Sequence, residues 1–185
     1  ADNEVVFVEY YSPSCGHCVR FAPEYDQLAL KVKEEGLNIV IAAVDLVTEK
    51  TVDEWVEVSG YPTLRLYLNG NEVEYSGART GEDILQFIKK AQTTTLSSLP
   101  EEIPNPSVIV RGIANNSPLQ LLPLLYTRFP IYSAEGESFE VSVQNGKQSN
   151  SYQGEANLQE VAAWLEDITE PLIVSVVDSK PAKKL

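Results

Sequence analysis

The sequence contains no methionine, one histidine and only two cysteines, Cys15 and Cys18, among its 185 residues. Two cysteines cannot form the several disulfides that hold a small secreted scaffold together, so that class of protein is excluded. Basic residues are also few, since 14 lysines and arginines stand against 27 aspartates and glutamates and leave a formal net charge of −13. A negative surface repels phosphate backbones and anionic lipids, and we therefore expect neither nucleic acid nor a membrane as a partner.

Long apolar runs are missing as well, because none approaches the roughly 18 residues that a membrane-spanning helix needs. Hydrophobic residues make up 43% of the chain and charged residues 22%. This balance is ordinary for globular proteins and excludes wholesale disorder or a fibrous repeat. The length indicates one or two domains of about 100 residues, each able to bury a core.

The first half of the chain alternates strand and helix patterns, which indicates an α/β domain with crossover helices. Val5–Tyr11 and residues 38–45 are apolar runs without alternating polarity, as is typical of strands buried on both faces. Four further elements are expected: a helix that opens at the cysteines and contains Pro23, a helical stretch from Thr48 to about Val58, a hairpin turning at Asn69-Gly70, and a helix from about Gly81. Residues 1–92 form the first predicted domain.

The second half repeats this order after residues 93–106, a segment rich in threonine, serine and proline that is typical of a linker. Its expected elements are a strand at Ser107–Ile113, a helix at Leu119–Phe129 interrupted by Pro123, strands at Phe139–Val143 and Lys147–Tyr152, and a helix over 158–168. A strand, an Asn-Gly turn, a strand and a helix thus occur in both halves. This recurrence predicts two related domains, 1–92 and 93–171.

Both ends of the chain differ from this plan. The apolar run Leu172–Val177 is predicted to be a strand with no partner left in the sequence, with which a third domain over 172–185 would begin. The first domain starts directly on its central strand. We therefore expect it to lack an N-terminal edge strand and helix.

The two cysteines lie at the start of the first predicted helix, after Ser12-Pro13-Ser14. Disulfide exchange requires a thiolate, which the free backbone N–H groups and the dipole of a helix N-terminus stabilise. Cys15 is therefore the predicted nucleophile, and Cys18, one turn along, can attack a mixed disulfide at Cys15 and release the substrate. Gly16 and His17 complete the motif, and His17 adds a polar or cationic neighbour.

A metal site is the main alternative interpretation of a Cys-x-x-Cys pair. Structural zinc takes four ligands, whereas the chain offers two cysteines with its one histidine between them and no second pair. Haem attachment would need a histidine where Val19 stands. Two inert core cysteines are the plainest interpretation, but their place between a strand and a helix argues against it. We therefore expect redox chemistry and no metal.

The segment from Val8 to Cys18, with Ala22-Pro23-Glu24-Tyr25 after it, resembles the catalytic domain of the protein disulfide isomerase family, whose signature is Cys-Gly-His-Cys. The similarity continues at Gly60-Tyr61-Pro62-Thr63 and from Tyr75 to Ile84. Residues 139–176 resemble the non-catalytic domain that follows in such proteins. The resemblance implies two tandem thioredoxin-like domains, each a central mixed sheet flanked by helices.

The resemblance also implies roles for residues outside the cysteine motif. Glu9 matches a buried carboxylate beneath the second cysteine that accepts and returns its proton. Tyr61 and Pro62 match the cis-proline loop that packs against the disulfide and binds the substrate chain. Arg79 matches an arginine that moves toward the second cysteine and favours its thiolate. The alternatives are an exposed strand glutamate at position 9 and a solvated arginine at position 79.

Two positions depart from the family pattern. Ser14 replaces a tryptophan that usually precedes the first cysteine and offers apolar surface to the substrate. Ala43 stands where related domains often carry a lysine that partners the buried glutamate.

The implied function is thiol–disulfide exchange, which forms and rearranges disulfide bonds in folding secretory proteins of the endoplasmic reticulum lumen. Unfolded or folding cysteine-containing proteins would be the substrates, and glutathione, an oxidase or a partner dithiol would exchange electrons without a bound cofactor. A thioredoxin-type reductase, and a chaperone or adaptor that binds unfolded proteins with little redox use, are the alternatives. The sequon Asn115-Asn116-Ser117 is compatible with secretory passage. Because no cysteine follows Cys18, the second domain is predicted to be redox-inactive.

Overall fold

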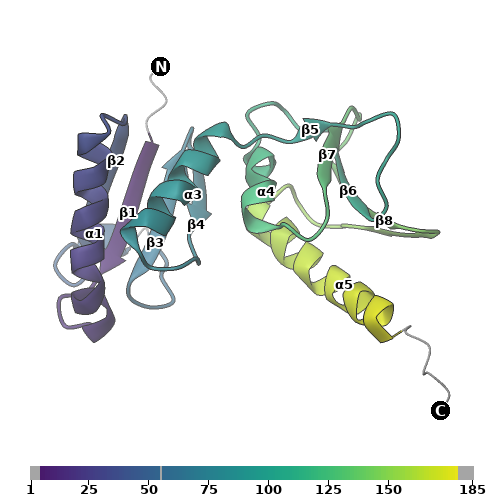
Figure 1. Cartoon of the computed structure of the whole chain (residues 1–185). Coiled ribbons are helices and arrows are strands. Elements are labelled where there is room, and N and C mark those ends of the chain that lie inside the picture. Colours follow the sequence, from purple (N-terminus) through teal and green to yellow (C-terminus); the bar gives the residue numbers. More distant parts are fainter. Residues whose placement is uncertain (1–4, 55, 179–185) are drawn as a thin grey trace, which may run out of the picture. The chain divides into compact units, whose positions relative to one another are not determined.

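The computed structural model describes residues 5–54 and 56–178 of the chain. The chain divides into two compact units, Ala1–Thr93 and Thr94–Leu185. Each unit contains one mixed sheet with helices against it (Figure 1).

The sheet of the first unit has the strand order β2-β1-β3-β4. Its strands are β1 (Val5–Tyr11), β2 (Ile39–Asp45), β3 (Thr63–Leu68) and β4 (Asn71–Glu74). The central strand β1 runs parallel to β2 and antiparallel to β3. Its helices are α1 (Gly16–Glu34), α2 (Lys50–Asp53) and α3 (Gly81–Thr93).

The core of the first unit surrounds β1, as its apolar run predicts. Helices α1 and α3 contact each other over one face of the sheet (Figure 1). Fully buried side chains from β1, both helices and β3 meet there, among them Phe7, Leu28, Ile84 and Leu66. Val8 and Tyr10 belong to a separate buried cluster with Leu46. Strand β1 therefore buries side chains on both of its faces.

The helix predicted from Thr48 to about Val58 is wrong in its length, because α2 covers only Lys50–Asp53. β-branched residues are frequent in this segment, and they lose side-chain freedom in a helix. Val52 and Val56 pack instead against the cluster around Val8.

The Phe7→Ala variant is expected to lower the free energy of unfolding of the first unit by about 3–5 kcal/mol, the usual cost of removing a buried phenylalanine side chain. Phe7 is 0% exposed, and its ring centroid lies 6.3 Å from that of Tyr25 and 6.1 Å from that of Tyr75. Urea unfolding followed by circular dichroism measures the change. Val40→Ala is the control, since Val40 is 46% exposed and its loss should cost less than about 0.5 kcal/mol. Equal effects of the two substitutions would contradict this view of the core.

The sheet of the second unit has the strand order β5-β7-β6-β8-β9. Its strands are β5 (Ser97–Ser98), β6 (Ser107–Arg111), β7 (Ile131–Ala134), β8 (Glu140–Asn145) and β9 (Gln148–Ser151). Its helices are η1 (Pro118–Leu121), α4 (Leu122–Leu125) and α5 (Leu158–Asp178). The central strand β6 is parallel to β7 and antiparallel to β8, so it occupies the position that β1 has in the first unit.

Several predictions for the second half are wrong in detail. The segment taken as a linker contains β5, which pairs with β7, and β7 itself was not predicted. The helix expected up to Phe129 ends at Leu125, because Tyr126 has an extended backbone. Short polar or mixed strands such as β5 and β7 lack the long apolar run that marks a central strand.

The strand predicted at Leu172–Val177 is also wrong, since this run is the last part of α5. A short continuous apolar run is compatible with either structure, and the preceding helix provides the hydrogen bonds that extend it. The third domain over 172–185 stays a prediction, and residues 179–185 lie outside the described residues.

Candidate active site

The two cysteines stand at the junction of β1 and α1. Cys15 is the N-cap residue of α1, with φ −79° and ψ 114°, and Cys18 lies one turn inside the helix. The turn before the helix is closed by the N–H group of Cys15, which donates to the carbonyl of Ser12 at 3.1 Å. Both thiols are free; Cys15 is half-buried, whereas Cys18 is only 4% exposed.

The environment of Cys15 favours its thiolate. Its pKa is lowered first by the backbone N–H of Cys18, then by the Cys18 thiol, with smaller contributions from the His17 N–H and the charge of Arg20. These N–H groups belong to the first turn of α1, where free donors gather. The thiol of Cys15 also lies 3.5 Å from the carbonyl oxygen of Tyr61, to which it donates.

The environment of Cys18 has the opposite effect. Its pKa is raised to about 11, mainly by burial, with smaller contributions in the same direction from Cys15 and Glu9 and an opposing one from a backbone hydrogen bond at Ser12. One thiol of the pair is thus prepared to ionise, and the other holds its proton.

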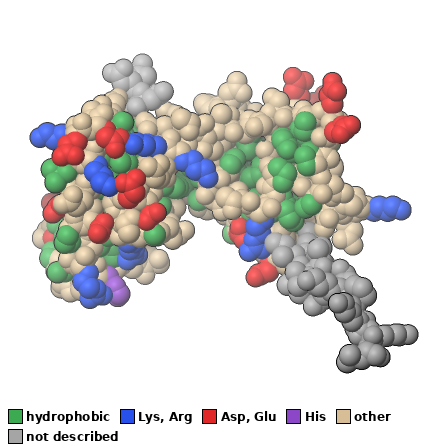
Figure 2. Space-filling view, in the orientation of Figure 1, with side chains coloured by type: hydrophobic (Ala, Val, Ile, Leu, Met, Phe, Trp, Pro, Cys, Tyr) green, Lys and Arg blue, Asp and Glu red, His purple; other side chains and the backbone are tan. Residues whose placement is uncertain are grey.

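The two residues between the cysteines lie at the surface. The chain's single histidine, His17, is exposed (Figure 2), and its Nδ1 lies 3.0 Å from Nη2 of Arg20. At Gly16, an added Cβ would meet only the end of the Arg20 side chain, at 3.5 Å. The described packing therefore makes no steric demand for glycine at this position.

Glu9 is 5% exposed in the middle of β1, which excludes an exposed strand glutamate. It pairs with Ala43 on β2 and Leu64 on β3. Burial raises its pKa to about 7, while the charge of Arg79 lowers the pKa and that of Asp26 raises it. Glu9 and Cys18 line the same cavity of about 260 Å³, so the carboxyl group and the buried thiol share one space.

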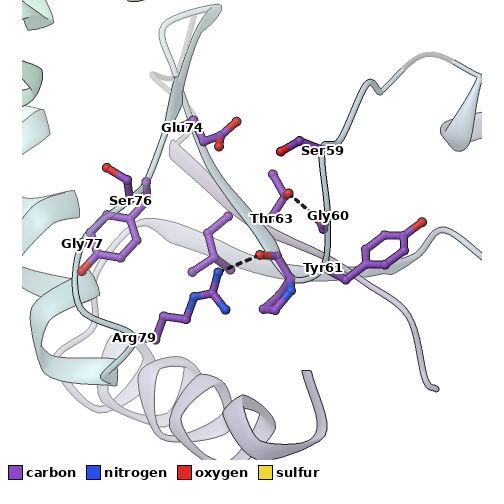
Figure 3. Close-up of a pocket in the computed structure, with 11 residues that line it drawn as sticks. Ser59, Gly60, Tyr61, Thr63, Glu74, Ser76, Gly77 and Arg79 are labelled. Carbon is purple, nitrogen blue, oxygen red and sulfur yellow. Dashed lines mark hydrogen bonds between the residues drawn. The ribbon is translucent and has the colours of Figure 1, made fainter. Parts of the chain in front are cut away.

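The loop before β3 forms the other side of the site. The Tyr61–Pro62 peptide bond is cis, as the resemblance implies, and Pro62 is buried. Arg79 reaches from the segment before α3 toward this loop, and its Nη2 donates to the carbonyl of Pro62 at 3.1 Å (Figure 3). Both residues line a cavity of about 310 Å³. The loop therefore adjoins Cys15 through Tyr61 and Arg79 through Pro62.

Comparison with known proteins identifies the first unit. The thioredoxin family model matches residues 1–90. Protein disulfide-isomerase A4 of Bos taurus is 40% identical over 101 residues, which cover 55% of this chain and 16% of the relative. Protein disulfide-isomerase of Drosophila melanogaster is 46% identical over 90 residues, or 49% of this chain and 18% of the relative. Residues 1–90 match the thioredoxin domain and are similar in sequence to protein disulfide-isomerases.

The likeness in fold extends beyond this thioredoxin domain. A crystal structure of human ERp44 aligns with a TM-score of 0.55 over 89% of this chain and 52% of ERp44, at 20% identity. At 20% identity, this likeness shows the fold alone. The shared fold confirms the predicted fold class of the two tandem units. The chain spans only 16% and 18% of the length of the two curated relatives.

The second unit has no counterpart of the cysteine motif of protein disulfide-isomerase domains. The turn after β6, at residues 112–117, takes the place of the turn that carries Cys15, and it contains no cysteine. Gly112 has φ +65°, and a Cβ there would lie 2.2 Å from the carbonyl oxygen of Ser138. This turn is therefore built around a close backbone contact and not around a thiol.

Sequence reasoning missed two charged residues of the site, Arg20 and Asp26. Arg20 contacts His17, and Asp26 lines the cavity of Glu9 and Cys18. Helical spacing could have indicated both, since Arg20 is three residues after His17 and Asp26 lies two turns after Cys18.

Among the described residues, no group of three or more histidine, cysteine, aspartate or glutamate side chains could hold a metal ion. Within the same part of the chain no helix is long and apolar enough to cross a membrane.

The buried carboxyl group should make stability depend on pH. Because the pKa of Glu9 is raised from 4.5 to about 7 in the folded state, the folded protein holds this proton more tightly than the unfolded chain does. The stability of the wild type relative to Glu9→Gln is therefore expected to fall as the pH rises from about 4.5 through 7. Urea unfolding at several pH values measures it. The control, Glu34→Gln at an exposed position of α1, should show no such trend, and parallel curves for wild type and Glu9→Gln would contradict the prediction.

Proposed function

We propose that the chain is a thiol–disulfide oxidoreductase that forms and rearranges disulfide bonds in folding secretory proteins. The observation that carries this proposal is the opposite shift of two pKa values within one helical turn, lowered at Cys15 and raised at Cys18. A lowered pKa supplies an attacking thiolate near neutral pH, and a raised pKa keeps the second thiol protonated until it is needed.

The reaction begins when the Cys15 thiolate attacks one sulfur of a substrate disulfide. A bond forms between Cys15 and that sulfur, the substrate S–S bond breaks, and the other substrate sulfur leaves as a thiolate. That thiolate can attack another disulfide of the substrate, which rearranges its bonds and eventually releases Cys15. Alternatively, Cys18 attacks Cys15, so that the Cys15–Cys18 disulfide forms and the substrate leaves reduced.

Residues around the cysteines have distinct roles in this proposal. Glu9 accepts the proton of Cys18, because both line one cavity. The backbone at Tyr61 and Pro62 contacts the substrate chain, since the Tyr61 carbonyl already lies beside Cys15. Arg79, held at the Pro62 carbonyl, is available to favour the Cys18 thiolate electrostatically.

Glutathione, an oxidase or another dithiol exchanges electrons with the cysteine pair in this proposal, and no bound cofactor is required. The substrates are unfolded or folding cysteine-containing proteins, and the setting is the endoplasmic reticulum lumen. The names of the relatives, which are protein disulfide-isomerases, support cysteine-containing proteins as substrates. The second unit, which has no cysteine, serves as a redox-inactive spacer or binding surface.

Refolding of scrambled ribonuclease by the full chain tests the proposed function. We expect recovery of ribonuclease activity in a glutathione buffer to be faster with the chain than without it. The control is the same chain treated with iodoacetamide at mildly acidic pH, where Cys15 reacts first because its pKa is lowered. Equal recovery with the chain, the alkylated chain and buffer alone would refute the proposal.

The redox potential separates an isomerase from a thioredoxin-type reductase. Groups that stabilise the Cys15 thiolate stabilise the reduced pair, which raises the potential. We expect a value nearer to about −180 mV, typical of protein disulfide isomerase, than to about −270 mV, typical of thioredoxin. Equilibration with glutathione, followed by separation of reduced and oxidised forms, measures it. A value near that of thioredoxin would favour the reductase.

A further inference from the structure

The cavity beside Cys18 contains a second carboxyl group besides that of Glu9. Asp26, on the second turn of α1 after Cys18, lines it together with Tyr25 from the same helix. From the sheet, Ala43 of β2 lines it and stands directly opposite Glu9 in the parallel register. Because Ala43 has only a methyl side chain, no charged group of β2 lies at this position.

Few charged or titratable groups face Glu9 within the described part of the chain. Arg79 faces it from the segment before α3, and Asp26, Cys18 and Tyr25 face it from α1. Across β1, both strand partners of Glu9 are uncharged. Among the described residues, Asp26 is the carboxylate and Arg79 the cation whose charges shift the pKa of Glu9.

Two of these groups have other hydrogen-bond partners. The hydroxyl of Tyr25 donates to the carbonyls of Phe7 at 3.1 Å and Ala42 at 2.7 Å. The guanidinium of Arg79 donates to the carbonyl of Pro62. Asp26, in contrast, is exposed at the cavity that Glu9 also lines, and its negative charge acts on Glu9.

We propose that Asp26 is a positioning residue for the resolving step, because its negative charge across the cavity makes Glu9 a better acceptor for the proton of Cys18. The inference rests on the proposed function. In the resolving step the Cys18 proton moves to the Glu9 carboxylate, the Cys18 sulfur forms a bond to Cys15, and the bond between Cys15 and the substrate breaks. The substrate leaves as a thiolate with the electron pair of that bond. A carboxylate that binds protons more tightly near neutral pH is a more efficient base for this transfer.

Like charges disfavour ionisation of each other, so removal of the Asp26 charge should let Glu9 ionise more easily. In the full chain, Asp26→Asn is expected to lower the titration midpoint of the Glu9 carboxyl by about 0.5–1 pH unit. Ala43→Lys, which introduces a cation opposite Glu9, should lower the Glu9 titration midpoint by more than Asp26→Asn does. Carbon-13 NMR of the Glu9 side-chain carboxyl measures the midpoint directly. The matched control is Glu34→Gln, which removes one carboxylate about 12 Å further along the same helix and should leave it unchanged.

The resolving step itself provides the second readout. Mixed disulfides formed with a disulfide-containing peptide are quenched with acid at successive times between pH 5.5 and 9. We expect the acid limb of the Asp26→Asn profile to move to lower pH, and the rate at high pH to fall about two- to threefold because Glu9 is a weaker base. A merely structural role of Asp26 would change the amplitude of the profile without moving its midpoint.

Several outcomes would overturn the inference. An unchanged Glu9 midpoint in Asp26→Asn would show that the charge of Asp26 does not act on Glu9. A lowered midpoint with an unchanged rate profile would show that this effect does not serve the resolving step. If the wild-type chain forms no mixed disulfide through Cys15, the proposed function fails and with it the role in resolution, whereas the NMR titration still reports the coupling of Asp26 to Glu9.

Discussion

The Cys15→Ser variant is expected to lose thiol–disulfide exchange, with a rate lower by on the order of 10³-fold or more, because a serine hydroxyl is not ionised near neutral pH. Cys15 is the half-buried thiol with the lowered pKa. Cys18 cannot take its place, since it is 4% exposed and burial raises its pKa to about 11. Turnover of a disulfide-containing peptide in glutathione buffer measures the loss.

Cys18→Ser provides the matched control, because it also replaces a thiol by a hydroxyl, but at the second cysteine of the motif. This variant should still attack substrate through Cys15, but it cannot resolve the mixed disulfide through Cys18. We therefore expect covalent complexes to accumulate with Cys18→Ser and none to form with Cys15→Ser. If the two variants form equal amounts of complex, the division of roles between the cysteines is wrong.

The Glu9→Gln variant is expected to slow escape from the mixed disulfide by about 10²-fold, the lower end of what general base catalysis contributes. Glu9 and Cys18 share a cavity, and loss of the Cys18 proton in a buried place is costly without an acceptor. Attack by Cys15 should change little, since the Cys15 thiolate is stabilised mainly by N–H groups of α1. Mixed disulfides should therefore accumulate.

The pH dependence adds a second, qualitative difference. Because the pKa of Glu9 is about 7, the wild-type resolving rate should rise with pH through neutrality as the carboxylate forms. The Gln variant has no such group and should lack this limb. Acid quench and gel separation at equal times measure the complexes in both proteins. Equal amounts at every pH would show that Glu9 has only a structural role.

Much of the fold could be predicted from local patterns. Strand β1 and helix α3 were predicted because a continuous apolar run and a helical apolar period each indicate one buried arrangement. The short elements α2, β5 and β7 could not be predicted in the same way. Each has four residues or fewer, so its hydrogen bonds and burial come from neighbouring elements and not from its own sequence.

The sequence by itself determined the setting of Cys15. A strand, a turn and a helix in that order place the first cysteine at a helix N-terminus, where local N–H groups favour a thiolate whatever the rest of the chain does.

Only the tertiary structure decided the surroundings of Glu9. Its burial depends on α1 and two strands that are distant in sequence, and the balance between Arg79 and Asp26 depends on which side chains those elements bring near it. The pKa of a buried carboxyl group is set by desolvation and by charges close in space. A local sequence pattern specifies helix ends, but it does not specify which distant side chains meet in a cavity.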